Sequence, residues 1–333
     1  ARALLTGCLA KWSETMSELE VYLGIDTSCY TTSVAFMDRQ ANLVGESRQI
    51  LKVHEGKCGL QQSEMVFQHT RNLPEMITNA MPRGAKIIGV CASGYPRPLP
   101  DSYMPAFLVG AGLARSVSVL NNIPLWLISH QENHLLAGKW SAGGPDDERF
   151  LFLHASGGTT DLLTAEKDGS GSYKLTEIGG SIDLHAGQFI DRIGVSLGLQ
   201  FPAGPALEKF AGTAAGPVEL PVSVKGCKAS LSGPATAAER KLAAGADPAG
   251  IALGVQKVLA ETFYRLIYNA CREYNTKSVL IAGGVASNTY IREYLHNKLT
   301  GRKISLWHPQ ARFSCDNASG CAAFAVLKGE KSV

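Results

Sequence analysis

Hydrophobic and polar positions along the first third of the chain alternate between two patterns. Short apolar runs typical of strands occur at 20–38, 85–93 and 123–129, and a Thr- and Ser-rich turn splits the first run into a hairpin. Small and apolar residues at helical spacing follow at 105–120, and a second helix is expected to begin in the segment 130–140. The helix expected from residue 130 starts where a strand ends, which is where open α/β sheets bind ligands.

The same pattern restarts near residue 149. Residues 149–168 read as a strand, a Gly turn and a strand. Further elements are expected in the order strand 173–180, helix 183–198, helix 250–274, a strand, Gly turn and helix over 278–295, strand 303–309 and helix 316–329. The segment 212–249 is rich in Gly, Ala and Pro and is expected to be an irregular surface excursion. The repeat predicts an α/β fold of two similar lobes that face each other across a cleft.

Length and composition agree with two lobes. The chain has 333 residues, 45% of them hydrophobic, whereas single cores stop growing near about 250–300 residues. We expect an N-terminal extension (1–20), a first lobe (21–125, completed by 310–333) and a second lobe (126–309) that carries the nucleotide and metal motifs. Residues 1–15 are interpreted as an upstream extension of a reading frame that starts at Met16.

Charge and cysteine content exclude few functions. The net charge is +3, and the basic stripe typical of a nucleic-acid-binding domain is missing, "GRK" at 301–303 and "KGCK" at 225–228 being the nearest candidates. The eight cysteines are scattered without a C-x-x-C pair, and no apolar run reaches the roughly 18 residues of a membrane span. A reduced cytoplasmic protein without a membrane partner is expected.

Two small-residue turns open the two lobes. One contains Ser28, and the other contains Ser156, Gly157, Gly158 and Thr159. Glycines let the backbone approach an anion, and successive N–H groups with hydroxyls form a nest for phosphate. The paired turns predict phosphate binding.

Further candidates lie in the second half. Gly283, Gly284 and Asn288 follow a strand and open a helix, which suits either a nucleotide or a close helix–strand contact with Asn288 as N-cap. Asp183 and Asp191 are eight residues apart and are expected on one face of a helix. One is a candidate helix cap, and the other, if it faces the cleft, could bind a sugar hydroxyl.

His130 and His134, four apart on a predicted helix, can bind one metal ion. A zinc peptidase needs Glu directly after the first His to activate water, but that residue is Gln131, and Glu132 faces away. Peptidase activity is therefore not expected. Asp316 is the candidate third ligand, although it could equally be a plain N-cap. Two His and one carboxylate with open positions suit Fe or Zn.

These motifs together, in this order, resemble one family: "LGIDTSC", "HQENH", "ASGGTTDLL", "GGSIDLHAGQFIDRIGVSLGLQFPAGPALEKFA", "AGGVASN" and "CDNAS". It is the transferase subunit that makes threonylcarbamoyladenosine in tRNA, formerly called O-sialoglycoprotein endopeptidase (peptidase family M22). The resemblance implies an actin/Hsp70-like ATPase (ASKHA) fold with ATP or the AMP moiety of an adenylate in the cleft. The implied metal ligands are His130, His134 and Asp316. The implied nucleotide or substrate contacts are Ser156 to Gly158, Asp191, Gly204 and Asn288.

The implied reaction moves a threonylcarbamoyl group from its adenylate to adenine in tRNA, with other subunits of the modification machinery, and a homodimer, as possible partners. The sequence departs from the family pattern at Tyr30, Thr31, Thr159, Leu184, His185, Gln188 and the segment 94–107. These departures are typical of a divergent paralogue. They leave two hypotheses open: a metal-dependent carbamoyltransferase, or a non-catalytic nucleotide-binding paralogue that acts as a regulatory or scaffold subunit.

Overall fold

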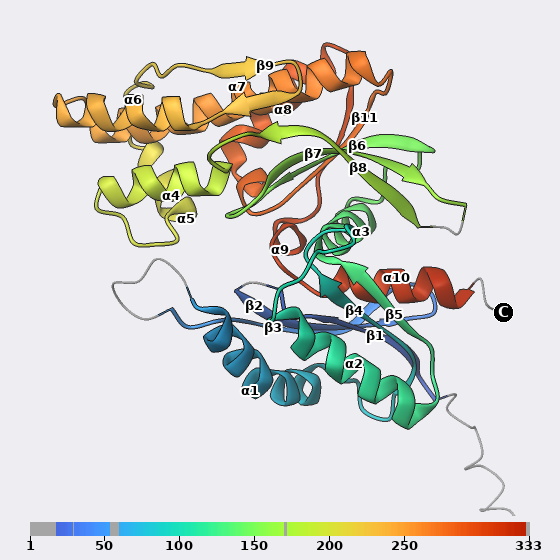
Figure 1. Cartoon of the computed structure of the whole chain (residues 1–333). Helices are drawn as coiled ribbons and strands as arrows, with labels where there is room; N and C mark the ends of the chain where they lie inside the picture. The colour runs from blue at the N-terminus through green and yellow to red at the C-terminus, as the bar shows by residue number, and fades with distance from the viewer. Residues whose placement is uncertain (1–17, 29, 54–59, 170–171, 331–333) are drawn as a thin grey trace, which may run out of the picture.

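The structure is a computed structural model that describes residues 18–28, 30–53, 60–169 and 172–330. It contains a five-stranded sheet in the order β3-β2-β1-β4-β5 and a seven-stranded sheet in the order β12-β11-β6-β7-β8-β10-β9. The two sheets form separate layers with helices between and outside them (Figure 1). Most of the expected N-terminal extension, residues 1–17, lies outside the described residues.

The five-stranded sheet forms the first lobe, with strands β1 (Glu20–Asp26), β2 (Thr31–Asp38), β3 (Leu43–Ile50), β4 (Lys86–Tyr95) and β5 (Leu125–Ser129). Side chains alternate across it with period two. Val21, Leu23 and Ile25 of β1 pack with α1 (Gln62–Ala80) and α2 (Phe107–Asn121), whereas Tyr22 packs on the other face with α10 (Ser319–Gly329). The sheet is therefore covered on both sides.

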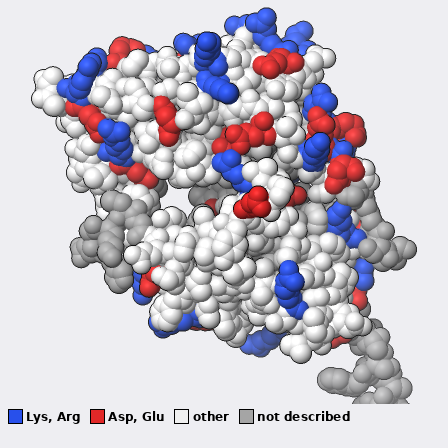
Figure 2. Space-filling model, in the orientation of Figure 1, with Lys and Arg blue, Asp and Glu red and all other residues white. Residues whose placement is uncertain are grey.

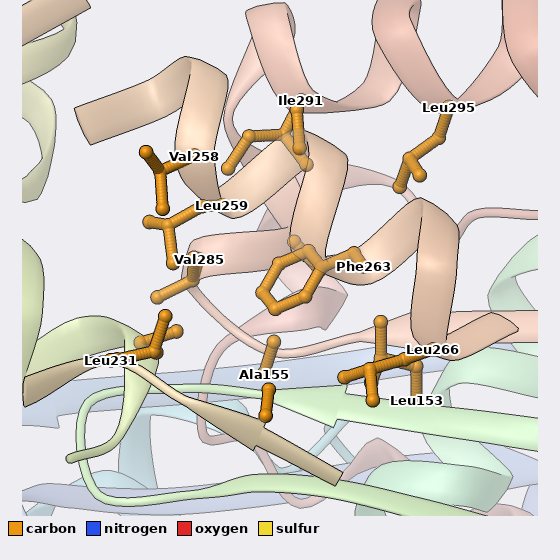
Figure 3. Close-up of a cluster of buried hydrophobic side chains, with 14 of the residues drawn as sticks. Leu153, Ala155, Leu231, Val258, Leu259, Phe263, Leu266, Val285, Ile291 and Leu295 are labelled. Atoms are coloured by element: carbon orange, nitrogen blue, oxygen red, sulfur yellow. The ribbon is translucent and has the colours of Figure 1, made fainter. Parts of the chain in front are cut away.

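The seven-stranded sheet forms the second lobe. Its strands are β6 (Arg149–Ala155), β7 (Thr160–Lys167), β8 (Tyr173–Ser181), β9 (Ser223–Lys225), β10 (Lys228–Ser230), β11 (Ser278–Ala282) and β12 (Ser305–Trp307). One face is covered by α4 (Ala186–Ser196), α5 (Gly204–Ala211), α6 (Ser232–Ala243), α7 (Pro248–Glu273) and α8 (Thr289–Thr300). Figure 3 shows the core beneath them, where Phe263 of α7 lies among Leu153, Val285 and Ile291.

A layer shared by both lobes lies between the sheets. It contains α3 (His130–Ala142), the short α9 (Ala311–Ser314) and α10 (Figure 1). The α3 and α10 helices touch so closely that a β-carbon on Gly320 would collide with the Asn133 carbonyl oxygen. One continuous cluster joins Tyr22 of the lower sheet, the α10 helix and Phe152 of the upper sheet. The two lobes thus share apolar packing as well as the chain.

The expected pattern of strand–helix units is confirmed for most elements, including the hairpins that open the lobes. The expectation for 212–249 is wrong, because β9, β10 and α6 lie there and Ala235 and Ala238 are fully buried. Its Gly, Ala and Pro content concealed a helix that packs through small side chains. The β3 strand and the α1 helix were not predicted. β3 is half-buried over most of its length and so lacks a clear alternation, and α1 contains Pro74, a residue that usually interrupts helices.

Two boundaries differ from expectation. The α4 helix begins at Ala186, with His185 as its N-cap, so Asp183 precedes the helix and does not share a helical face with Asp191. The β5 strand belongs to the five-stranded sheet, so by sheet membership the first lobe extends to Ser129 rather than 125. Within the described residues, no helix has the length and apolar character needed to cross a membrane.

Candidate metal and nucleotide site

A capping box fixes the start of α3 and with it the two histidines. The Ser129 hydroxyl accepts from the Glu132 backbone N–H at 3.1 Å, and the Glu132 carboxylate accepts from the Ser129 N–H at 2.7 Å. This reciprocal pair starts the helix at His130. His134 then lies one turn later on the same side.

The structure brings Asp316 to both histidines. Nε2 of His134 lies 3.0 Å from Nε2 of His130 and 3.2 Å from Oδ1 of Asp316, and the third edge of this triangle is 3.5 Å. A tetrahedral zinc ion with ligands at about 2.1 Å holds its ligand atoms about 3.4 Å apart. The three side chains therefore fit a divalent metal ion, which would retain an open position for a ligand.

Asp26 at the end of β1 supports this triad from below. Its carboxylate is fully buried, lies 3.7 Å from Nδ1 of His130 and accepts from both the N–H and the hydroxyl of Ser28. At 3.7 Å the carboxylate makes no hydrogen bond to Nδ1 of His130, but its buried charge favours this orientation of the ring and raises its basicity. The Ser28 hydroxyl is consequently occupied by Asp26 in this structure.

The charges of the triad are strongly coupled. Burial lowers the pKa of His130, but the carboxylates of Asp26 and Asp316 outweigh it and raise that pKa to about 10. Burial and the charge on His130 lower the pKa of His134. Burial alone would raise the pKa of Asp316, yet hydrogen bonds from both histidines hold it far below its usual range. Without a metal ion the pair of histidines thus carries one positive charge, on His130.

His154, which was predicted only as part of a strand, lies next to the metal triad. Its ring at the end of β6 is 1% exposed and its centroid lies 4.3 Å from that of His134. Neither ring nitrogen has a hydrogen-bond partner in the described part of the chain. Burial and the nearby histidines lower its pKa well below the usual value, so the ring is neutral and adds no charge that would repel a cation.

The glycine turn at 156–159 lies beside the triad at the ends of β6 and β7. Gly157 and Gly158 are exposed and face open space. The N-terminus of α4 approaches so closely that a β-carbon on Gly187 would collide with the Gly157 backbone. Exposed glycine backbone beside a helix N-terminus suits a phosphate group. Figure 2 shows the surface hollowed between the upper and lower parts of the molecule.

The second glycine turn lies directly beside the first. Gly283 has a φ of +110°, and a β-carbon there would collide with the Ala155 carbonyl oxygen. Gly284 is exposed. Asn288 is the N-cap of α8 and accepts from the Ile291 N–H at 3.0 Å. The plain interpretation of Asn288 as a cap is therefore realised.

The two aspartates of the long motif bind protein groups. Asp183 accepts hydrogen bonds from Ser230, Ser232 and the Leu231 N–H, and these bonds outweigh burial and lower its pKa. Asp191 accepts from the Ala203 N–H, one residue before Gly204 begins α5. Both carboxylates thus join α4 and the segment before it to neighbouring helices, and the structure does not leave either one unpartnered.

An arginine from the unusual segment 94–107 bridges the two lobes. Arg97 pairs with Asp161 of β7 at 2.9 Å and with Glu177 of β8 at 2.9 Å. The Gln131 amide also donates to Asp161 at 2.7 Å. Gln131 therefore has a structural role at the position where a zinc peptidase would have its glutamate, and Glu132 is committed to the helix cap. The Arg97 contact could not be predicted from sequence, because its partners lie 64 and 80 residues away.

Known proteins resemble this chain in sequence and in fold. A profile of the TsaD family, "tRNA N6-adenosine threonylcarbamoyltransferase", matches residues 103–323. A relative of that description from Nitrosomonas eutropha is 28% identical over 92% of this chain and 91% of its own. A "probable bifunctional tRNA threonylcarbamoyladenosine biosynthesis protein" from Methanothermobacter thermautotrophicus is 27% identical over 92% of this chain, which spans only 55% of that relative's length.

A solved structure of similar fold is the activator of 2-hydroxyisocaproyl-CoA dehydratase from Clostridium difficile with bound ADPNP. It shares 14% identity at a TM-score of 0.54, covering 94% of this chain and 96% of that one. The two sheets, the paired hairpins and this similarity define a two-lobed ATPase fold of the actin/Hsp70 (ASKHA) class. Within that class, the chain belongs to the TsaD family of tRNA N6-adenosine threonylcarbamoyltransferases.

Proposed function

We propose that this chain holds a divalent metal ion, Fe or Zn, and the AMP moiety of an adenylate between its lobes, and moves a threonylcarbamoyl group from that adenylate to an adenine of tRNA. The observation that supports this most is the triangle of His130, His134 and Asp316, whose ligand atoms lie 3.0–3.5 Å apart beside the glycine turns. Two curated relatives carry names from this modification.

The reaction needs no protein nucleophile. The adenine amino group attacks the carbamoyl carbonyl, a C–N bond forms, the C–O bond to phosphate breaks, AMP leaves and the amino group loses a proton. The metal ion would supply Lewis-acid polarisation of the carbonyl. The turn Ser156–Thr159 and the paired turn at Gly283 and Gly284 would receive the phosphate and nucleoside, and Asp26 would keep His130 oriented.

In this proposal the motif residues Asp183, Asp191, Gly204 and Asn288 would act indirectly, by holding the helices around the nucleotide. Glu208 of α5 supports the arrangement because its carboxylate accepts from the Thr289 N–H at 2.8 Å and ties α5 to the start of α8. Tyr30, a departure from the family pattern, packs against Leu51 and Met65 in the first lobe. The set of three metal-ligating side chains is complete in this chain, which favours the enzyme over the non-catalytic paralogue.

The test is reconstitution with ATP, bicarbonate, threonine, tRNA and the enzyme that makes the adenylate. We expect threonylcarbamoyladenosine with the wild-type chain and a loss of at least about 100-fold with His134→Ala. Nucleotide binding without any modified adenosine, also after addition of other subunits of the machinery, would instead assign the regulatory or scaffold role. Sedimentation with the same components would show whether the chain works as a homodimer in the cytoplasmic complex.

A further inference from the structure

The outer face of α7 and α8 carries a ladder of tyrosines and cations. The rings of Tyr264 and Tyr268 stack with centroids 5.8 Å apart. Lys298 Nζ lies 5.9 Å from the Tyr264 centroid and 5.5 Å from that of Tyr294, and the Arg302 guanidinium lies 4.8 Å from the Tyr268 ring. We call this set, together with Arg272, the tyrosine–cation face.

The cations of this face lie over rings and form no close ion pair, although the charge of Lys298 also acts on the nearby Glu261 carboxylate. Arg272, Lys298 and Arg302 are exposed and form no salt bridge within the described ranges. By contrast, Arg265 on the same helix pairs with Glu261 at 2.6 Å, which commits that carboxylate. A cation over an aromatic ring keeps its full charge, so the three exposed cations remain available to an anion.

Folding gathers two basic segments around this face that looked ordinary in the sequence. The turn "GRK" at 301–303 contributes Arg302. The hairpin tip "KGCK" at 225–228 is held against α7, because Asn269 donates to the Gly226 carbonyl at 2.8 Å. Figure 2 shows basic side chains along the upper edge of the molecule, where α7 and α8 lie in Figure 1.

The face lies on the side of the second sheet opposite the metal triad. Alternation along β11 shows this, because Val279 and Ile281 pack in the α7 core, whereas Leu280 and Ala282 pack in the core that contains α3 residues. A ligand on the tyrosine–cation face is therefore separated from the cleft by the sheet itself. Any contact there involves a part of a large substrate that does not react.

We propose that the tyrosine–cation face binds RNA, namely a part of the tRNA remote from the modified adenine; this rests on the proposed function and names its substrate-binding surface. Cations without a close ion pair meet phosphates, and the partly exposed tyrosine rings offer bases the aromatic surface that the cations and neighbouring rings leave uncovered. An acidic protein segment would use the cations but leave the rings without a matching partner.

The experiment measures binding of two RNAs to the full chain by fluorescence anisotropy. One is an unmodified tRNA transcript with an adenine in its anticodon loop, and the other is its isolated anticodon stem-loop. The variant is Arg272→Glu/Lys298→Glu/Arg302→Glu. The matched control reverses three exposed cations of the first lobe, Arg83→Glu/Lys86→Glu/Arg115→Glu. Tyr268→Ala removes the ring and hydroxyl that hold Arg272 and Arg302 while all charges are kept, and circular dichroism monitors folding of each variant.

We expect the face variant to weaken full-length tRNA binding at least about 10-fold and to lower the salt slope by about 2–3, since each phosphate contact contributes about 0.7–0.9. Binding of the stem-loop should not change, Tyr268→Ala should weaken tRNA binding several-fold, and the control should bind as wild type. Equal tRNA affinity of wild type and face variant, or no tRNA binding by wild type, overturns the inference. The inference is also overturned if the face variant loses affinity equally for the tRNA and for the stem-loop, or if the control variant loses as much tRNA affinity as the face variant. Modification of the stem-loop is assayed separately, so failure of the face leaves the proposed reaction standing.

Discussion

Replacing Arg97 with Ala should destabilise the protein at pH 8 but hardly at pH 5. Arg97 faces Asp161, a carboxylate that is 5% exposed. Burial raises the pKa of Asp161 from 3.8 to about 6 although the guanidinium lowers it. The folded protein thus binds this proton more tightly than the unfolded chain. The stabilisation this gives is complete below about pH 4 and is lost as the pH rises through 6, about 3 kcal/mol in all.

The magnitude for the variant follows from the state of Asp161. At pH 8 the carboxylate is ionised, and without Arg97 only the Gln131 amide remains beside it. Removing one partner of a buried ion pair costs about 3–5 kcal/mol, and we expect the lower end because Arg97 is 36% exposed. At pH 5 Asp161 is mostly protonated in both proteins, so the cost should fall to about 1 kcal/mol or less.

Urea unfolding followed by tryptophan fluorescence at both pH values measures these differences. In an Asp161→Asn background, Arg97→Ala should cost little at either pH. The control is Arg39→Ala, which removes an exposed pair with Glu20 and should leave the unfolding midpoint unchanged at both. A loss for Arg97→Ala that is the same at pH 5 and pH 8, or that persists in the Asp161→Asn background, would refute the assignment of the bridge to a buried carboxylate.

Three further outcomes are expected. His134→Ala should reduce bound metal, measured by mass spectrometry of the purified protein, from about one ion per chain to near zero, and normal occupancy would contradict the triad. Metal binding below pH 10 should release about one proton, because the pKa of His130 is about 10 and ligation needs the neutral ring; calorimetry in buffers of different ionisation enthalpy measures this number, and zero would contradict it. Phe263→Ala should lower the free energy of unfolding by about 3–5 kcal/mol, whereas Phe67→Ala, at an exposed side chain, should have little effect in the same urea titration.

The sequence predicted the parts of the site that are local. His130 and His134 are four residues apart and follow a capping serine at the end of a strand, so their convergence on one helix face followed from spacing alone. Asp316 could be named from the sequence only as a candidate that could equally be a plain N-cap, because 182 residues separate it from His134. The position of His154 beside the triad was not predicted, because a His within an apolar strand resembles an ordinary core residue. The ion pairs of Arg97 were not predicted, because they depend on how the two lobes pack against each other.

The elements that were missed or predicted wrongly also lack a strong local pattern. The α6 helix buries alanines, whose small side chains produce a weak periodic signal, and β3 is half-buried along its whole length and so lacks a clear alternation. Likewise the tyrosine–cation face arises only when α7 and α8 lie in register. No short stretch of sequence contains both the α7 residues and the α8 residues of this face.

The central layer decides what can be removed from this protein. Its α10 helix comes from the last residues described, yet it packs on β1 and α3 and follows directly on Asp316. A truncation that stops before residue 310 would therefore strip one ligand from the metal triad and expose apolar surface on the first sheet at once. Neither half can be expected to fold as an independent fragment, because a cut between the sheets would divide one shared apolar cluster.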